Sequence, residues 1–495
     1  MKNVIFGLAL LILIILKIYL YLQLGPTTPE YLHLYRAGSL LRYGRDEIGN
    51  PLPPLFHGPT GYQLPLLDYL LVPVPSGLIF DLLLWLLPAA LVLVAFRSHF
   101  LGLVFLAQPL FLWPGSWPAK LFLFLVTVFL LALRRRAVLP AAIVVLLCLE
   151  TVTDAYLLLP LFLLGLIFFR PYRRFSLQVF SITLFLILAI GLLTARVPGI
   201  RQSFVAAHFG LFTNPQVTTT INSLRGEHLL SRTSYLSKLL HNKLTFGYII
   251  LQNSARILNP SFLFGLGDKD PFSSSQKIPP LLIVLLPFLF ISLFHLRRLP
   301  RPILWLTAVS LLIVSLPSTV PIESQLFIFS LSLCFLITSH LTPRLFLSAA
   351  AVSLLLLVPM VYFSIHYLPP LVWVARSGGL ENIIRLSRDN SPTPLLLADD
   401  VYPDPGPFLA YSMRIPPPVN LQPKYHYRNY LRQVNNIEIV SPTDPRLTAL
   451  DVIPVVATGQ LRQYISNPLD RWDTVVSDPF NHPLLSRLIY AKPKI

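Results

Sequence analysis

The sequence predicts an α-helical polytopic membrane protein with eleven transmembrane helices and a C-terminal extracytoplasmic α/β domain. The 495-residue chain is 54% hydrophobic and only 12% charged, whereas about a quarter of the residues of a soluble protein are charged. Its apolar residues lie in long blocks, and about 20 such residues form a helix that crosses roughly 30 Å of hydrocarbon. After residue 364 these blocks stop. A single soluble domain is therefore excluded.

The apolar blocks are candidate membrane spans. The first, at residues 4–24, has no small-residue cleavage site and is longer than the apolar region of a signal peptide, so we expect a retained helix. The others lie at 77–96, 99–113, 119–133, 137–150, 155–169, 175–195, 279–296, 302–317, 324–340 and 345–364. Lys17, within the first block, is expected to extend to the outer head groups or to meet a phosphate in a lipid-facing groove.

The basic residues predict the orientation of these spans. The formal net charge is +17, and alternate short connections contain Arg but no Asp or Glu: Arg97, Arg134, Arg135, Arg136, Arg170, Arg173, Arg174, Arg297, Arg298, Arg301 and Arg344. Positively charged loops stay in the cytoplasm, so the N-terminus is predicted inside and, after an odd number of spans, the C-terminus outside. A nucleic-acid-binding protein would instead gather its basic residues on one polar face, and we expect no nucleic-acid partner.

Three long polar segments share the outer side in this topology, at 25–76, 196–278 and 365–495. Every carboxylate before residue 364 then lies outside or at the outer boundary. A reaction that needs a carboxylate base must therefore occur on the outer face, although acidic turns can also be plain solvated loops. Trp113 and Trp117 are expected in the interfacial aromatic belt rather than stacked on a sugar.

The chain divides into a transmembrane domain, 1–364, and an extracytoplasmic α/β domain, 365–495. In the second part, short apolar runs at 395–398, 437–440, 452–457 and 474–476 alternate with polar helix-like stretches such as 379–388. This pattern predicts a small, largely parallel sheet. Asp399, Asp400 and Asp478 follow predicted strand ends, where open α/β sheets often bind ligands. The alternative is that they are ordinary turn acids.

The first outer loop begins with a predicted helix. Pro29 is suited to the first turn of a helix and Gly44 to its end, so a short helix lies between them, directly beyond the first span. Residues at spacings of three and four give it a membrane-facing stripe, namely Tyr31, Leu34, Gly38 and Leu41. Glu30 is then held where the chain leaves the membrane. Alternatively, Glu30 is simply an N-terminal acid favoured by the helix dipole.

Two outer loops together resemble a known family. The first carries Glu30, then Tyr-Arg-Ala-Gly-Ser-Leu-Leu at 35–41, Gly-Arg-Asp-Glu-Ile-Gly at 44–49, and a run of Pro and aromatic residues up to Pro73. The second carries Asn214, Arg-Gly-Glu at 225–227, His-Asn-Lys at 241–243 and Asn-Pro-Ser-Phe-Leu-Phe-Gly-Leu-Gly-Asp at 259–268. The order resembles that of GT-C glycosyltransferases, which include protein O-mannosyltransferases and lipid A aminoarabinose transferases, and is closest to a bacterial branch of that superfamily. The resemblance covers most of the chain.

This resemblance implies a membrane glycosyltransferase. A sugar would move from a polyprenyl-phosphate donor to an extracytoplasmic glycan, lipid or protein, with inversion at the anomeric carbon. The acceptor hydroxyl needs a base, which would be Glu30, and the departing phosphate needs cations, for which Arg225, His241 and Lys243 are candidates. Asp268 would contact a sugar hydroxyl, orient Lys243 or help to hold a divalent metal ion. No metal-ligand spacing is evident, so no cofactor is assigned.

Four further residues of the first loop are expected to support the site, namely Tyr35, Arg36, Asp46 and Glu47. In the superfamily the first loop carries an Asp-Glu pair whose Asp is the base, and here Pro29 takes the place of that Asp. Either Glu30 has assumed the base role, or the chain binds lipid or acceptor without turnover as an envelope scaffold. A transporter or flippase for a lipid-linked solute is the third alternative, and it would require ionisable residues buried at mid-membrane.

Overall fold

The structure is a computed structural model. It describes residues 2–46, 51–194, 245–266, 279–294, 301–316, 351–362 and 376–489, apart from gaps within these ranges, together with residues 219, 222 and 223. The longer gaps lie at 399–401, 417–432, 449–452, 458–470 and 478–482.

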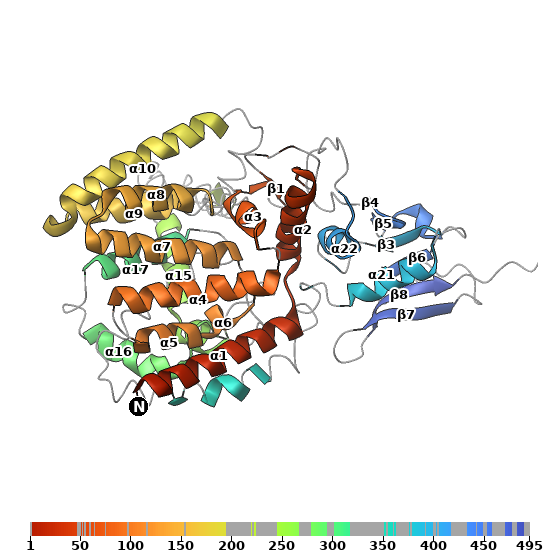
Figure 1. Cartoon of the computed structure of the whole chain (residues 1–495), viewed down its shortest axis with the longest axis horizontal. Helices are drawn as coiled ribbons and strands as arrows, with labels where there is room; N and C mark the ends of the chain where they lie inside the picture. Colours follow the sequence, from red (N-terminus) through yellow and green to blue (C-terminus); the bar gives the residue numbers. More distant parts are fainter. Residues whose placement is uncertain are drawn as a thin grey trace, which may run out of the picture.

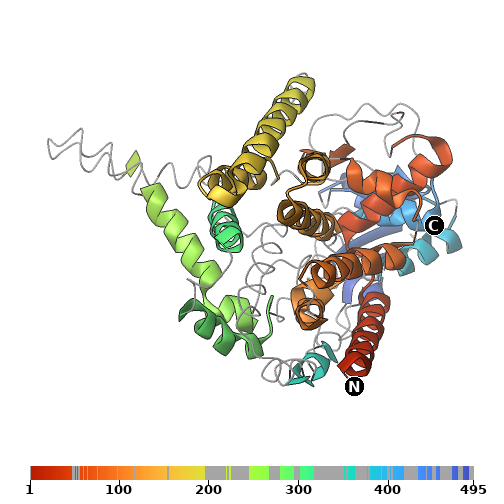
Figure 2. The same cartoon turned by 60° about the vertical axis from the view of Figure 1, so that its left-hand side comes forward.

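Apolar helices make up most of the described chain (Figure 1). They are α1 (Lys2–Leu24), α4 (Gly77–Phe96), α5 (His99–Ala107), α6 (Pro109–Leu112), α7 (Trp117–Arg135), α8 (Val138–Leu149), α9 (Ala155–Ile167), α10 (Arg173–Thr194), α15 (Thr245–Leu258), α16 (Leu286–Phe294) and α17 (Arg301–Val314). All but α15 overlap a predicted span. Figure 2 shows α15, coloured lime, set apart from α1–α10, and its Ile257 packs in a small separate core with Leu263 and Leu285.

The described helices support membrane association. Three stretches within the described residues are long and apolar enough to cross a membrane, namely Phe6–Leu24, Trp117–Arg135 and Arg170–Leu192. Four shorter apolar stretches fall on other predicted blocks, namely Gly77–Leu91, Val138–Leu149, Ala155–Ile167 and Arg301–Ile313. The block at 324–340 lies outside the described residues. These apolar helices are consistent with a polytopic membrane protein, and the total of eleven spans stays a prediction.

Short connections join α4 to α5, α7 to α8 and α8 to α9, and they fall at two ends of the bundle. Hydrogen bonds gather several connections at one end: Lys17 Nζ to Leu112 O (3.0 Å), Leu66 N to Glu150 O (3.3 Å) and Leu110 N to Pro280 O (3.3 Å). Arg134 and Arg135 lie in the last turn of α7, at the other end. We call the first end the α2 end, because α1 is followed there by the helix α2 (Thr28–Tyr43). The side of the membrane on which it lies stays a prediction.

The helix predicted between Pro29 and Gly44 is present as α2 (Thr28–Tyr43). Gly44 adopts a left-handed conformation (φ 65°), and its N–H donates to Leu40 O at 2.9 Å, which closes the last turn. A two-stranded hairpin, β1 (Phe56–Gly58) and β2 (Gly61–Gln63), and the short helix α3 (Leu66–Leu71) complete the described part of this loop. The first helix of the loop therefore starts and stops where the sequence predicted.

The predicted membrane-facing stripe on α2 is wrong. The Tyr31 ring meets Phe408 edge-on, with centroids 4.8 Å apart, and lies 5.9 Å from Tyr411. Both partners belong to α22 (Gly406–Met413), in the C-terminal part of the chain, and Leu34 is buried in the core of the helical bundle. Spacing identifies an apolar face of a helix, but it does not say whether lipid or protein covers that face.

The C-terminal part folds as an α/β unit around a six-stranded sheet with strand order β4-β5-β3-β6-β8-β7. The strands are β3 (Leu395–Ala398), β4 (Gln433–Val434), β5 (Ile437–Val440), β6 (Ile453–Ala457), β7 (Arg471–Ser477) and β8 (Pro483–Ile489), and the helix α21 (Leu380–Asp389) precedes them. Among the described strands, β3 pairs in parallel with β5 and with β6, and the other pairs are antiparallel. The sheet is mixed rather than largely parallel, because β4 joins β5 and β7 joins β8 by short hairpin connections, which force antiparallel pairing.

Helix α2 contributes to both hydrophobic cores. Its Leu34 and Ala37 belong to the core of the helical bundle, whereas Tyr35 packs with Leu395, Leu409 and residues from the other strands of the α/β unit. Figure 1 accordingly shows α2 between the helical bundle and α22. One helix therefore joins the two parts of the molecule.

We predict that Gly165→Ala destabilises the bundle. A Cβ at Gly165, in α9, would overlap the indole ring of Trp305 in α17, and the indole N–H donates to Leu161 O (3.2 Å) and Phe162 O (3.1 Å). Displacing that ring should cost about 1–3 kcal/mol of unfolding free energy. Thermal unfolding in detergent measures this, and Gly247→Ala in α15 is the control, because a Cβ there meets nothing within 4 Å. Equal stability of the two variants would contradict this packing.

Candidate functional site

Glu30 lies in the first turn of α2 and is 2% exposed. Its Oε2 accepts a hydrogen bond from the backbone N–H of Thr27 at 2.7 Å, the side-chain half of a capping box. Its Oε1 is buried and has no hydrogen-bond partner within the described structure. The pattern Thr-x-x-Glu at 27–30 predicts this cap and was missed in the sequence, where only the helix dipole was considered. One oxygen of the carboxylate is therefore structural and the other is uncommitted.

Arg376 approaches Glu30 from the segment after the last predicted span. Its Nη1 donates to Gly25 O at 2.7 Å and its Nη2 to Pro114 O at 2.9 Å, while the guanidinium carbon lies 5.1 Å from the centre of the Trp113 ring. Arg376 is only 4% exposed. It therefore joins the C-terminal segment to the start of α2 and to the turn before α7. Nothing in the sequence pairs this isolated arginine with residues more than 260 positions earlier.

A second group of buried charges lies at the same end, between α1, α4 and α7. Asp81 contacts two lysines: Lys17 Nζ lies 2.6 Å from Oδ2, and Lys120 Nζ lies 2.7 Å from Oδ1. Both ammonium groups also donate to Trp113 O, at 3.2 Å and 2.9 Å. The two lysines and the aspartate are at most 2% exposed. This arrangement satisfies charges that would otherwise be too costly to bury.

Two sequence-based expectations are corrected here. Lys17 does not extend to lipid head groups, because Asp81 and two main-chain carbonyls hold it inside the bundle. Trp113 and Trp117 are 4% and 0% exposed, so they lie in the protein interior rather than in an interfacial belt. The sequence did contain a signal, since oppositely charged residues within apolar blocks must find each other to be buried.

We call Glu30, Arg376, Lys17, Asp81 and Lys120 the polar cluster. Burial raises the pKa of Glu30 above its ordinary value, and the Thr27 N–H and the charge of Arg376 oppose that rise. Burial lowers the pKa of Arg376, with Glu30 opposing. An arginine stays protonated even so. With all five groups ionised, three cations face two carboxylates, so the cluster has room for one more negative charge.

The residues expected to support Glu30 have other contacts. Arg36 lies 3.7 Å from Asp68 and stacks over the Phe56 ring at 5.0 Å, while His33 Nδ1 lies 2.7 Å from the other oxygen of Asp68. Tyr35 packs against the α/β unit. On a helix of 3.6 residues per turn, positions 35 and 36 lie roughly 140° and 240° around from position 30. Both residues thus bind α2 to its neighbours on faces other than that of Glu30.

Asp46 is fully buried just beyond α2, and its carbonyl oxygen lies 3.3 Å from the Ser39 hydroxyl that donates to it. This contact uses the main chain of Asp46, so the expected role of its side chain stays a prediction. Five other residues predicted for the transfer site lie outside the described residues, namely Glu47, Arg225, His241, Lys243 and Asp268. The three acids predicted at strand ends of the α/β unit also lie outside them, namely Asp399, Asp400 and Asp478. Their roles stay predictions. Among the described residues, no group of three His, Cys, Asp or Glu could hold a metal ion.

No protein-family model matches the chain, and no curated protein matches it. The GT-C resemblance therefore rests on the sequence motifs alone.

We predict that Asp81→Asn strongly destabilises the protein. The substitution would leave two buried ammonium groups without a counter-charge, which typically costs about 3–5 kcal/mol. Replacing all three residues with apolar ones, Lys17→Met, Asp81→Leu and Lys120→Met, should recover most of that loss. Thermal unfolding in detergent compares the variants. An Asp81→Asn protein as stable as the wild type would contradict the buried pairing.

We predict that Glu30→Gln is stabilised relative to the wild type as the pH rises. The pKa of Glu30 is raised above 4.5 in the folded state, so the folded protein favours the protonated carboxyl. The wild type therefore loses unfolding free energy as the pH rises through the folded-state pKa. Gln keeps the hydrogen bond to Thr27 N–H without taking a charge. The unfolding free energies of the variant and the wild type are measured at pH 4 and at pH 8. The variant should gain stability relative to the wild type between pH 4 and pH 8. A pH-independent difference would place Glu30 in contact with water.

Proposed function

We propose that the chain is a GT-C-like membrane glycosyltransferase that moves a sugar from a polyprenyl-phosphate donor to an extracytoplasmic acceptor. The observation that carries the proposal is a set of buried polar atoms on neighbouring residues without partners in the described structure: Glu30 Oε1, Arg376 Nε and Trp113 Nε1. Buried polar atoms are nearly always satisfied in proteins, so such a group favours a polar ligand at this place. One atom accepts a proton and two donate hydrogen bonds.

The proposed chemistry uses Glu30 as the base. Its raised pKa and uncommitted Oε1 suit a carboxylate that takes the proton of an acceptor hydroxyl while the oxygen attacks the anomeric carbon. The bond between the anomeric carbon and the phosphate oxygen breaks, and the polyprenyl phosphate leaves with the bonding electrons. Arg376, a buried cation whose charge acts on Glu30, would balance the charge of that phosphate. With all five groups of the polar cluster ionised, its one excess positive charge favours the same assignment.

The position of the cluster also supports a lipid-linked donor. Lys17, Asp81 and Lys120 lie within the apolar helices α1, α4 and α7, and Glu30 and Arg376 lie directly beyond the end of α1. A donor with an isoprenoid tail and a phosphate head requires this succession of apolar and charged surroundings. We place the cluster at the extracytoplasmic surface, following the distribution of arginines in the sequence.

We expect Glu30→Gln to reduce sugar transfer about 10²- to 10⁴-fold while the protein still folds, because a general base contributes a factor of that size. Membranes that contain the full chain are incubated in turn with tritium-labelled undecaprenyl-phosphate mannose, glucose and aminoarabinose, and the label that reaches glycan, lipid or protein is counted. Glu381→Gln is the matched control, since Glu381 lies in the first turn of α21 but is exposed.

Two results would end the proposal. A full rate for Glu30→Gln with a donor that the wild type uses would exclude Glu30 as the base. A wild type that transfers none of the three sugars yet binds undecaprenyl phosphate would favour the envelope scaffold. The capping role of Glu30 Oε2 favours that second function, because the cap gives Glu30 a structural role that needs no catalysis.

A further inference from the structure

A second polar site lies between α2 and α22, at the opposite end of α2 from Glu30. It is a cavity of about 310 Å³, lined by residues from the last two turns of α2 and from the end of α22 and the residues that follow it. That volume lies at the lower end of the range of roughly 300–1,000 Å³ that small-molecule sites occupy. The cavity can therefore admit one ligand of about the size of a monosaccharide.

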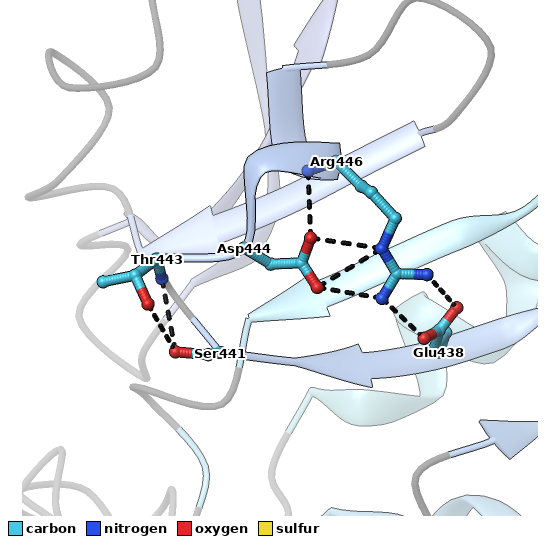
Figure 3. A network of polar contacts seen from close by, with 5 residues as sticks. All are labelled: Glu438, Ser441, Thr443, Asp444 and Arg446. Carbon is cyan, nitrogen blue, oxygen red and sulfur yellow. Dashed lines mark hydrogen bonds and ion pairs between the residues drawn. The ribbon is translucent and has the colours of Figure 1, made fainter.

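Two arginines from distant parts of the chain give the cavity a positive charge. Arg42 belongs to α2 and Arg414 follows α22, and none of the described residues that line the cavity is acidic. Arg446, in the same α/β unit, is by contrast ion-paired: it donates to Glu438 Oε1 (2.7 Å) and to Asp444 Oδ2 (2.8 Å), as Figure 3 shows. Arg42 and Arg414 make no such ion pair within the described structure.

The backbone at Arg414 is a separate observation. Arg414 ends α22 in a left-handed conformation, with φ 56° and ψ 39°. Glycine is strongly preferred at such a helix end, since a side chain there costs roughly 1 kcal/mol. Arg414 thus carries a side chain at a position where glycine would be less costly. Such costs are concentrated where a side chain has a binding role.

Aromatic and hydroxyl groups complete the lining. Tyr43 and Ser39 line the cavity from α2, and Tyr411 and Ser412 line it from α22. The Ser39 hydroxyl donates to Arg45 O at 2.7 Å, so it can serve a ligand as an acceptor. Tyrosine rings pack against the C–H faces of sugar rings, and hydroxyl groups match the donors and acceptors of a glycan. Paired arginines bind phosphate or carboxylate oxygens through two-point hydrogen bonds. The combination fits a ring that carries hydroxyl groups and one anionic group.

We propose that the cavity between α2 and α22 binds an anionic sugar, whose phosphate or carboxylate is held by Arg42 and Arg414 and whose ring packs on Tyr43 and Tyr411. The site does not depend on Glu30 or on the proposed transfer reaction. It also brings together the helical bundle and the α/β unit, so a ligand there would bridge the two parts.

Calorimetric titration of the full chain in phosphatidylcholine nanodiscs tests this. Glucose 1-phosphate and glucuronate should bind. Glucose and inorganic phosphate should each bind at least about tenfold more weakly, because glucose lacks the anionic group and phosphate lacks the sugar ring. A parallel titration in discs that contain phosphatidylglycerol distinguishes the source of the anion. Loss of sugar binding there identifies a lipid head-group phosphate as a competing occupant of the same two arginines, and unchanged binding identifies a soluble glycan.

Variants separate recognition from folding. Arg42→Ala and Arg414→Gly should each weaken glucose 1-phosphate binding about tenfold or more. Arg414→Gly should unfold at the same or a higher temperature than the wild type, because Gly relieves the left-handed backbone. Arg385→Ala, at an exposed position of α21, is the control and should bind normally. Equal binding of glucose and glucose 1-phosphate, or normal binding by Arg414→Gly, would overturn the proposal.

Discussion

The architecture of the α2 end depends on the mutual neutralisation of charges that the apolar helices have removed from water. Asp81 is held between two lysines from different helices, and the carbonyl oxygen of Trp113 accepts from both. Separating any of these groups would leave a buried charge unpaired, at a cost of several kcal/mol. The relative positions of α1, α4 and α7 are therefore fixed by electrostatics as well as by packing. The core that the described helices share is otherwise largely apolar.

Arg376 extends this constraint to the rest of the molecule. Two of its hydrogen bonds reach main-chain carbonyls of segments that precede α2 and α7, and its cationic face lies on an indole ring. Main-chain partners do not swing away as side chains do, so Glu30 is held beside a fixed positive charge. A carboxylate with one oxygen committed to a helix cap and one uncommitted is preoriented before any ligand arrives. Such preorganisation is what electrostatic catalysis requires.

Helix α2 relates the two proposed sites geometrically. Glu30 and Arg42 are twelve positions apart on one helix, which corresponds to roughly 18 Å at 1.5 Å per residue. Because α2 packs on the helical bundle through Leu34 and on the α/β unit through Tyr31 and Tyr35, a shift of that unit would move both sites together. The intervening hydrogen bond between His33 and Asp68 and the ion pair between Arg36 and Asp68 attach the same helix to α3. Few positions along α2 are thus free of a tertiary contact.

The sequence by itself determined the elements whose cause is local. Apolar blocks placed the helices, Pro29 and Gly44 marked the ends of α2, and short apolar runs located β3, β5, β6 and β7, because backbone propensity and side-chain period act within a few residues. Tertiary structure alone decided that Arg376 meets the start of α2, that α22 covers Tyr31, and that the sheet is mixed. These outcomes depend on which distant surfaces bury each other, and neither spacing nor composition along the chain carries that information. Lys17 lies between the two cases: its charge within an apolar block required a partner, but only the packing of three helices made that partner Asp81.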